Sequence, residues 1–403
     1  MSERLSHRGQ RWMLPEGIEE VLPERAIALE QLRRDLIDLW AGWGYQLVMP
    51  PLIEYLDSLL TGTGNDLELA TFKLTDQMTG RTLGVRADMT PQVARIDAHC
   101  LRHEAPTRLC YIGTVLHTRT DGFAGSRSPL QAGAELYGHA GIESDLEVVQ
   151  LMLRTLEAAG VGPIFLDLGH VGLFRALARR AGLDHEAEAE LFDALQRKAV
   201  PEIEALTGSL GEPGAALARL VDLNGGPEVL DRAVRELGHL DDDVTDALDS
   251  LRRLVERLQA RQPQLTLHLD LAELRGYRYH TGLVFAAYLS GHGQAVAQGG
   301  RYDGIGRVFG RERPATGFST DLHTLAAHSS RLQQALRGGI FAPSEGDVAL
   351  ERMIEALREA GETVVRALPR QAGAAQACGC DRELVMINES WTVRPVAAAP
   401  TGV

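Results

Sequence analysis

The chain has 403 residues, 44% of them hydrophobic, and a formal net charge of −14. This length allows a large core and more than one folding unit. The acidic balance argues weakly against a dedicated nucleic-acid-binding protein, because phosphate contacts need clustered positive charge, although a basic patch can sit on an acidic protein. The lysines, Lys73 and Lys198, follow no G-x-x-x-x-G-K pattern, so the sequence predicts no P-loop.

Targeting and metal signals are absent from the sequence pattern. No apolar run follows residues 1–10, so we expect no signal peptide. No stretch approaches the roughly 18 apolar residues of a membrane span, so we expect a soluble, cytoplasmic protein with no membrane partner. Near Cys378 and Cys380 neither a C-x-x-C partner nor a His completes a metal site. We therefore expect reduced thiols, and no metal or cofactor.

The first predicted element is a helix over 26–43, in which apolar residues recur every three or four positions. They are Leu29, Leu32, Leu36, Leu39, Trp40 and Trp43. Gly44 ends this helix, and 45–49 is predicted as a strand that stops at Pro50 and Pro51.

Two predicted strands over 107–117 and 129–137, joined by a polar loop over 118–128, indicate an antiparallel pair. Helical periodicity then dominates 173–261. Strand character returns at 266–270 and 282–289, where the second strand is followed by a turn over 290–293 that predicts another hairpin.

The end of the chain predicts a small α/β unit. A helix is expected around Leu350–Leu357, with Gly361 as its C-cap, followed by a strand that starts at 363–365 and a second strand over 383–387. The Ala- and Pro-rich segment 396–403 is expected to be frayed.

The strand over 129–137 reads PLQAGAELY. Side chains alternate across a strand, so Gln131, Gly133 and Glu135 share one face, and the aliphatic residues share the other. An amide and a carboxylate on either side of a glycine gap suit a small polar ligand that carries an amine. A strand face turned to solvent accounts for the same pattern equally well.

Two further clusters carry polar chemistry. Residues 274–282 read LRGYRYHTG, a group of Arg, Tyr and His that could either pack structurally or line a pocket. Residues 298–303 read QGGRYD, whose paired glycines allow close approach of backbone or ligand.

The strings GGRYD, QAGAELYG and RGYRYHTGLVF, together with the helix–strand–proline opening, resemble the histidyl branch of class II aminoacyl-tRNA synthetases. The resemblance covers roughly 10–325. It implies an α+β fold, with an antiparallel sheet flanked by helices, and a homodimer formed through the first motif, which is the helix–strand–proline opening over 26–51. The expected organisation is a core over 1–325, a helical insertion at about 171–262 and a shortened α/β unit over 340–395.

The resemblance assigns candidate residues to a site for free histidine. Gln131 and Glu135 match the pair that holds the amino acid, with the carboxylate facing its α-amine. Asp88 and Thr90 match a loop of that site, and Arg275 matches an arginine used during activation. Tyr279 and His280 match two positions on the imidazole side, of which the second is tyrosine in the family.

Two substitutions separate this chain from an active synthetase. The family places an arginine that grips ATP fourteen residues before the Gln, where this chain has His117. Its second arginine falls on Thr324, in the third motif over 317–324. We therefore expect no adenylation activity and no catalytic residues.

The C-terminal unit resembles an anticodon-binding domain compressed around 371–379, so no tRNA partner is expected. A histidine pocket, lost ATP arginines and a trimmed C-terminal unit together resemble the regulatory subunits of ATP phosphoribosyltransferase. That family partners a short-form catalytic subunit in histidine biosynthesis, and the resemblance implies feedback by histidine. The alternatives are an active histidyl-tRNA synthetase, a ligase for another amino acid, or a scaffold with an empty pocket.

Overall fold

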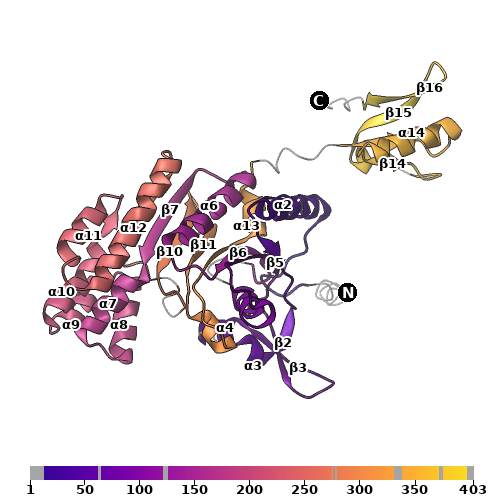
Figure 1. The fold of residues 1–403 in the computed structure, drawn as a ribbon. Helices are drawn as coiled ribbons and strands as arrows, with labels where there is room; N and C mark the ends of the chain where they lie inside the picture. The colour runs from indigo at the N-terminus through magenta and orange to yellow at the C-terminus, as the bar shows by residue number, and fades with distance from the viewer. Residues whose placement is uncertain are drawn as a thin grey trace, which may run out of the picture. The chain divides into compact units, whose positions relative to one another are not determined.

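The computed structural model describes residues 13–61, 65–120, 126–274, 276, 279–330, 338–371 and 375–396 (Figure 1). The chain forms two compact units, one ending at Arg331 and one beginning at Leu332. Within the described ranges, no helix is both long enough and apolar enough to cross a membrane.

The first unit is built on a mixed sheet whose described strands number nine, in the order β1-β5-β6-β12-β11-β10-β7-β9-β8. Its central strands pair antiparallel, as the resemblance implied. Near the two edges, β1 pairs parallel with β5 and β7 parallel with β9. The strands are β1 (Gln46–Leu47), β5 (Thr107–Thr114), β6 (Leu130–Tyr137), β7 (Ile164–His170), β8 (Asn224–Gly225), β9 (Thr266–Asp270), β10 (Leu283–Leu289), β11 (Ala297–Arg301) and β12 (Ala315–Asp321).

Helices cover one face of this sheet. Helix α2 (Pro23–Gly42) confirms the helix predicted over 26–43, and α6 (Ile142–Ala158) and α13 (Leu322–His328) pack beside it and against the sheet. Trp40 of α2 is fully buried and meets Phe318 of β12 edge-on, with ring centroids 6.3 Å apart. Its indole nitrogen donates to the Thr155 hydroxyl of α6 at 2.9 Å.

Strands β5 and β6 confirm the predicted antiparallel pair, with Leu109 opposite Glu135 and Tyr111 opposite Gly133. Of the loop predicted over 118–128, residues 121–125 lie outside the described residues. The predicted strand over 45–49 contains only the short β1. The predicted strand over 266–270 is β9, and the predicted hairpin is β10 with β11.

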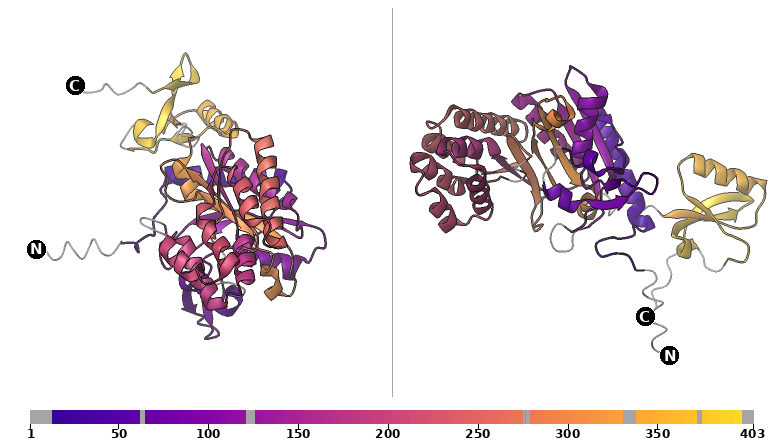
Figure 2. Two further views of the ribbon diagram at one scale, coloured as in Figure 1. Left: turned by 90° about the vertical axis from the view of Figure 1, so that its left-hand side faces the viewer. Right: turned by 90° about the horizontal axis from the view of Figure 1, so that it is seen from below.

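The helical pattern over 173–261 is confirmed as a group of helices between β7 and β9. They gather beside β7 at one end of the sheet (Figure 1), and Figure 2 shows them as one group. These helices are α7 (Val171–Ala181), α8 (His185–Gln196), α9 (Val200–Thr207), α10 (Gly211–Arg219), α11 (Val229–Leu237) and α12 (Asp242–Arg261).

A small antiparallel sheet, β2 (Ile53–Tyr55), β4 (Thr82–Val85) and β3 (Phe72–Thr75), follows β1 in the sequence. After β4 the chain enters α5 (Thr90–Arg95) and the π-helix η1 (Ile96–Leu101). Asp88 and Thr90, at the start of α5, lie beside β5 and β6. Thr90 contacts the Tyr111 hydroxyl of β5, and Asp88 accepts a hydrogen bond from Gln131 of β6.

In its described residues the second unit forms a four-stranded sheet in the order β14-β13-β15-β16 and carries the helix α14. Helix α14 (Val348–Glu359) and β14 (Val364–Arg366) confirm the predictions there, and Gly361 adopts φ +84° just beyond the helix. Strand β15 (Cys380–Ile387) is longer than predicted, and β13 (Gly339–Ala342) and β16 (Ser390–Pro395) were not predicted. Of the segment expected to be frayed, residues 397–403 lie outside the described part.

Candidate functional site

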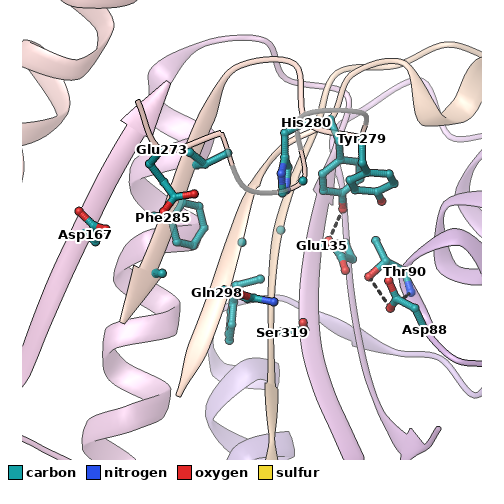
Figure 3. Close-up of a pocket in the computed structure, with 17 residues that line it drawn as sticks. Asp88, Thr90, Glu135, Asp167, Glu273, Tyr279, His280, Phe285, Gln298 and Ser319 are labelled. Atoms are coloured by element: carbon teal, nitrogen blue, oxygen red, sulfur yellow. Dashed lines mark hydrogen bonds between the residues drawn. The ribbon is translucent and has the colours of Figure 1, made fainter. Parts of the chain in front are cut away.

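The sheet face opposite α2 and α6 carries a cavity of about 260 Å³ (Figure 3). Its floor is a row of residues that the strand register brings side by side. Ser319 of β12 pairs with Gln298 of β11, Gln298 with Ala286 of β10, and Ala286 with Asp167 of β7. The polar or charged residues that line it are Asp88, Thr90, Glu135, Asp167, Glu273, Tyr279, His280, Gln298, Tyr302 and Ser319.

Glu135 of β6 is the most buried acid of this cavity, with 1% of its surface exposed. The hydroxyl of Tyr111 donates to its Oε1 at 2.9 Å, and the Tyr302 hydroxyl donates to its Oε2. Burial raises the pKa of Glu135 to about 8, against the lowering effect of both tyrosine hydrogen bonds. The carboxyl is therefore mostly protonated at neutral pH.

Gly317 of β12 makes room for this carboxyl. It lies opposite Glu135 in the sheet register. A Cβ atom added to Gly317 would overlap the Glu135 carboxylate and lie 2.9 Å from the Ala134 carbonyl oxygen. The absence of a side chain at this position thus allows the acid to lie flat against the neighbouring strand.

Asp88 is linked to Glu135 through two hydroxyl groups. Its Oδ1 accepts a hydrogen bond from Thr90 Oγ1 at 3.1 Å, and that hydroxyl lies 3.1 Å from Tyr111 Oη. Asp88 Oδ1 also accepts from the Gln131 amide at 2.7 Å, while Gln131 Oε1 accepts from the Met89 backbone at 2.9 Å. Gln131 is not among the residues that line the cavity, so it positions Asp88 from behind.

Tyr279 and His280 line the cavity from the segment before β10. Tyr279 stacks on Tyr302 with ring centroids 4.9 Å apart, and its buried hydroxyl has no hydrogen-bond partner among the described residues. A Cβ on Gly300 would lie 2.8 Å from the His280 ring, which therefore packs directly over β11. Arg275 lies outside the described residues.

The two positions expected to carry ATP-binding arginines have other partners. His117 Nε2 lies 2.8 Å from the Ala87 carbonyl oxygen. Thr324 Oγ1 donates to Asp321 at 3.1 Å. The Asp321 carboxylate also accepts from the backbone nitrogens of Leu130, at 2.9 Å, and His323, at 3.1 Å, so it caps the start of α13.

One part of the sequence interpretation is wrong. The face of β6 that carries Gln131, Gly133 and Glu135 was expected to offer room for a ligand above the glycine. A Cβ on Gly133 would instead lie 2.5 Å from Tyr111 Oη and 2.6 Å from the Phe318 carbonyl oxygen. Neighbouring strands fill that space, because a glycine in a sheet is often a point of close approach.

Several cavity residues were not predicted from the sequence. Tyr302 stands inside the quoted string QGGRYD, and Ser319 inside the third motif, so both could have been proposed. Asp167 of the lining, and Tyr111, which donates to Glu135 from behind the lining, carry no local signal, because the strand pairing alone brings them to the site. Among the described residues, no group of three or more His, Cys, Asp or Glu is arranged to hold a metal ion.

Comparison with known families divides the chain. Residues 17–325 match the family model of histidyl-tRNA synthetase. Residues 337–394 match the model of the C-terminal domain of the ATP phosphoribosyltransferase subunit HisZ.

Curated relatives are similar over nearly the whole chain. An ATP phosphoribosyltransferase regulatory subunit of Thioalkalivibrio sulfidiphilus is 59% identical over 387 residues, which cover 95% of this chain and 98% of the relative. One from Alkalilimnicola ehrlichii is 55% identical over 401 residues, with coverage of 98% and 100%.

Solved structures share the fold. An ATP phosphoribosyltransferase regulatory subunit/histidyl-tRNA synthetase from Bacillus halodurans superposes with a TM-score of 0.80 at 26% identity, over 91% of this chain and 95% of that one. A histidyl-tRNA synthetase from a Nostoc species has a TM-score of 0.76 at 18% identity, over 93% and 91%, and is similar in fold alone.

Proposed function

Because the chain belongs to the family of ATP phosphoribosyltransferase regulatory subunits, we propose that it is a cytoplasmic, non-catalytic subunit required by a short-form catalytic subunit. The reaction served is the first step of histidine biosynthesis. The proposal is carried by the pair of substitutions at His117 and Thr324, in a chain whose cavity still contains carboxyl groups. A core that has lost the groups for activating an amino acid has to act through another protein.

The surroundings of Thr324 support the loss of ATP binding. A triphosphate needs donors and positive charge, which an arginine supplies as a charge-assisted fork. Here the position holds a hydroxyl bonded to Asp321, whose carboxylate occupies the donors at the start of α13. A phosphate brought to that place would meet a negative charge rather than an arginine.

The cavity suits free histidine as the regulatory ligand. Its volume of about 260 Å³ lies just below the roughly 300–1,000 Å³ of pockets for larger molecules. The described residues that line it include carboxyl groups and no Lys or Arg. The α-amine of histidine would lie between Asp88 and Glu135, and Tyr279 and His280 would line the side that takes the imidazole.

Self-association through the first motif is the remaining part of the proposal. Large apolar side chains that follow α2 are exposed, at 37% for Leu47, 77% for Met49, 45% for Leu52 and 47% for Ile53. Neighbouring apolar side chains left in water favour a protein contact. A second copy of the chain would cover them.

Addition of this chain to a short-form ATP phosphoribosyltransferase is expected to raise its activity until the two proteins reach the ratio of their complex. The rise should be accompanied by a shift of both proteins into one larger species. The measurements are the rate of phosphoribosyl-ATP formation during titration and size-exclusion chromatography with light scattering. Heat-denatured chain serves as the control. If the titration changed neither the rate nor the size of the assembly, the chain would not be a subunit that this enzyme requires, and the proposal would be wrong.

Histidine binding is expected to release a proton. Below pH 8 the empty cavity holds a protonated Glu135, and a nearby ammonium group favours the ionised form. Affinity should therefore rise with pH between about 6.5 and 8, by at most about tenfold per unit for one linked proton. Calorimetry in buffers of different ionisation enthalpy measures the release. Glu135→Gln should abolish the buffer dependence, and a wild type without it would contradict the arrangement.

A further inference from the structure

Two thiols of the second unit, those of Cys378 and Cys380, have no part in the proposed function. They stand on either side of Gly379, where the short helix η5 (Ala375–Cys378) leads into β15. Both cysteines are free, and Cys378 is half-buried whereas Cys380 is buried. Helix η5 packs against β13 and β15, so the two thiols lie where the chain enters the sheet.

The chain bends between the two cysteines. Two residues with one residue between them are at most about 7 Å apart in their Cα atoms, and a disulfide usually spans about 4.4–6.8 Å. Gly379 shortens this separation, because its φ is +70° and its backbone nitrogen donates to the Gln376 carbonyl oxygen at 3.1 Å in a turn. Glycine adopts this left-handed conformation without steric cost. The backbone therefore brings the two cysteines within reach of an S–S bond.

The side chain of Cys380 points back toward Cys378. Its Sγ lies 3.7 Å from the Cys378 carbonyl oxygen, to which the thiol donates a weak hydrogen bond. The Cys378 Sγ in turn accepts a hydrogen bond from the Gln371 amide at 3.1 Å. Both sulfurs are thus held at one turn, and an S–S bond needs rotation of the side chains rather than separation of η5 from the sheet.

The surroundings of the two thiols suit different steps of an oxidation. Cys378 is half-buried, so a small oxidant reaches it, and the hydrogen bond from Gln371 favours the thiolate, which is the nucleophilic form. Burial raises the pKa of the Cys380 thiol, and the negative charges of Cys378 and Asp381 raise it further. Cys380 therefore stays protonated until its neighbour has been oxidised.

We propose that Cys378 and Cys380 form a redox-modification site, which a peroxide converts into an intramolecular disulfide. The Cys378 thiolate attacks one peroxide oxygen and the O–O bond breaks, so that Cys378 becomes a sulfenic acid and the other oxygen leaves as hydroxide or alkoxide. The Cys380 sulfur then attacks the Cys378 sulfur, and the Cys380 proton leaves with the hydroxyl group as water. Two thiols thus give two electrons to the peroxide, and a reducing thiol restores them by exchange.

Hydrogen peroxide added to the full-length chain tests the proposal, with the remaining thiols alkylated by N-ethylmaleimide and mapped by mass spectrometry. In the wild type, we expect Cys378 and Cys380 to lose alkylation together, in one peptide lighter by two hydrogen atoms, and to regain it with dithiothreitol. Cys380→Ser should stop the reaction at a sulfenic acid on Cys378, which dimedone traps. Cys100→Ser, at an exposed thiol of the first unit, is the matched control and should keep the disulfide.

The wild-type peptide map decides the proposal without any variant. Cys378 oxidised to sulfinic acid beside a Cys380 that is still alkylated would overturn it, because the second thiol would then take no part. A disulfide between two chains, or between Cys100 and either thiol, would overturn it as well. So would peroxide that oxidises Cys100 and leaves the pair unchanged. The site depends only on contacts within the second unit, so these results leave the proposed function of the chain untouched.

Discussion

Purified protein is expected to catalyse no histidine-dependent exchange of pyrophosphate into ATP. The resemblance to the synthetases places His117 and Thr324 at the two positions where an active enzyme has the arginines that stabilise the triphosphate. Hydrogen bonds to charged groups contribute about 1.5–3 kcal/mol each, so their joint loss removes roughly three to six kcal/mol. That corresponds to a rate lower by about a hundredfold to ten-thousandfold or more. The Asp321 carboxylate at the start of α13 adds repulsion to this loss.

The measurement is exchange of labelled pyrophosphate, with an active histidyl-tRNA synthetase as positive control. Contaminating synthetase from the expression host is removed by a second affinity step, after which the background should be independent of the amount of protein. Exchange that scales with this chain through both steps would mean that it activates histidine, and the non-catalytic assignment would be wrong.

Glu135→Ala is expected to weaken histidine binding by about 1.5–3 kcal/mol, or roughly ten- to 150-fold, if its contact with the amine is charge-assisted. The substitution removes the carboxyl that Tyr111 and Tyr302 hold in place. Glu135→Gln is the matched variant, because it keeps the volume and loses the ionisation. Calorimetry on the chain alone and in complex with the catalytic subunit gives the affinities.

Folding has to be checked in the same experiment, because Glu135 lies in the middle of the sheet. Thermal unfolding of both variants shows whether the fold persists. An unchanged affinity in a folded Glu135→Ala protein would mean that the cavity lined by Glu135 no longer binds histidine and is only inherited from a synthetase. The absence of histidine binding to the wild-type complex would lead to the same conclusion.

Much of the central sheet could be predicted because its strands carry local signals. The alternation in 129–137 gave the correct face for Gln131 and Glu135, and β6 extends over most of that range. The pairing with β5 followed from two predicted strands joined by a polar loop, with no other predicted element between them. Such predictions need only the period of the side chains and the length of the connection.

The alternation of side chains in 129–137 does not predict which residues of the neighbouring strands lie against this face. Gly133 was interpreted as room for a ligand, whereas β5 sends Tyr111 into that space. Glu135 was expected to present a carboxylate, and the two tyrosines that bury it come from positions 24 and 167 residues away. The burial of Glu135 and its raised pKa depend on how strands from distant parts of the chain pair. A local sequence pattern does not show that pairing.

In the second unit, the strands β13 and β16 were not predicted from the local sequence pattern. Strand β13 is four residues long and begins at Gly339, and the edge strand β16 ends at Pro395. Glycine and proline count against a strand in a local pattern, although proline is tolerated at a sheet edge. The helix between them has a strong apolar face, with Leu350 and Ile354 buried, and was predicted correctly.

The overlap at Gly317 makes two distant positions epistatic. An alanine at 317 would displace the Glu135 carboxylate from its place against β12, so its cost depends on what stands at 135. With the shorter Asp at 135, or with Gly, the same alanine would meet mainly the Ala134 carbonyl oxygen. Variants at the two positions are therefore coupled, and a double-mutant cycle should give an interaction energy well away from zero. In a relative that first replaces Glu135 by a smaller residue, Gly317 can then change to alanine at a lower cost in stability. If Gly317 changes first, the resulting protein is strained.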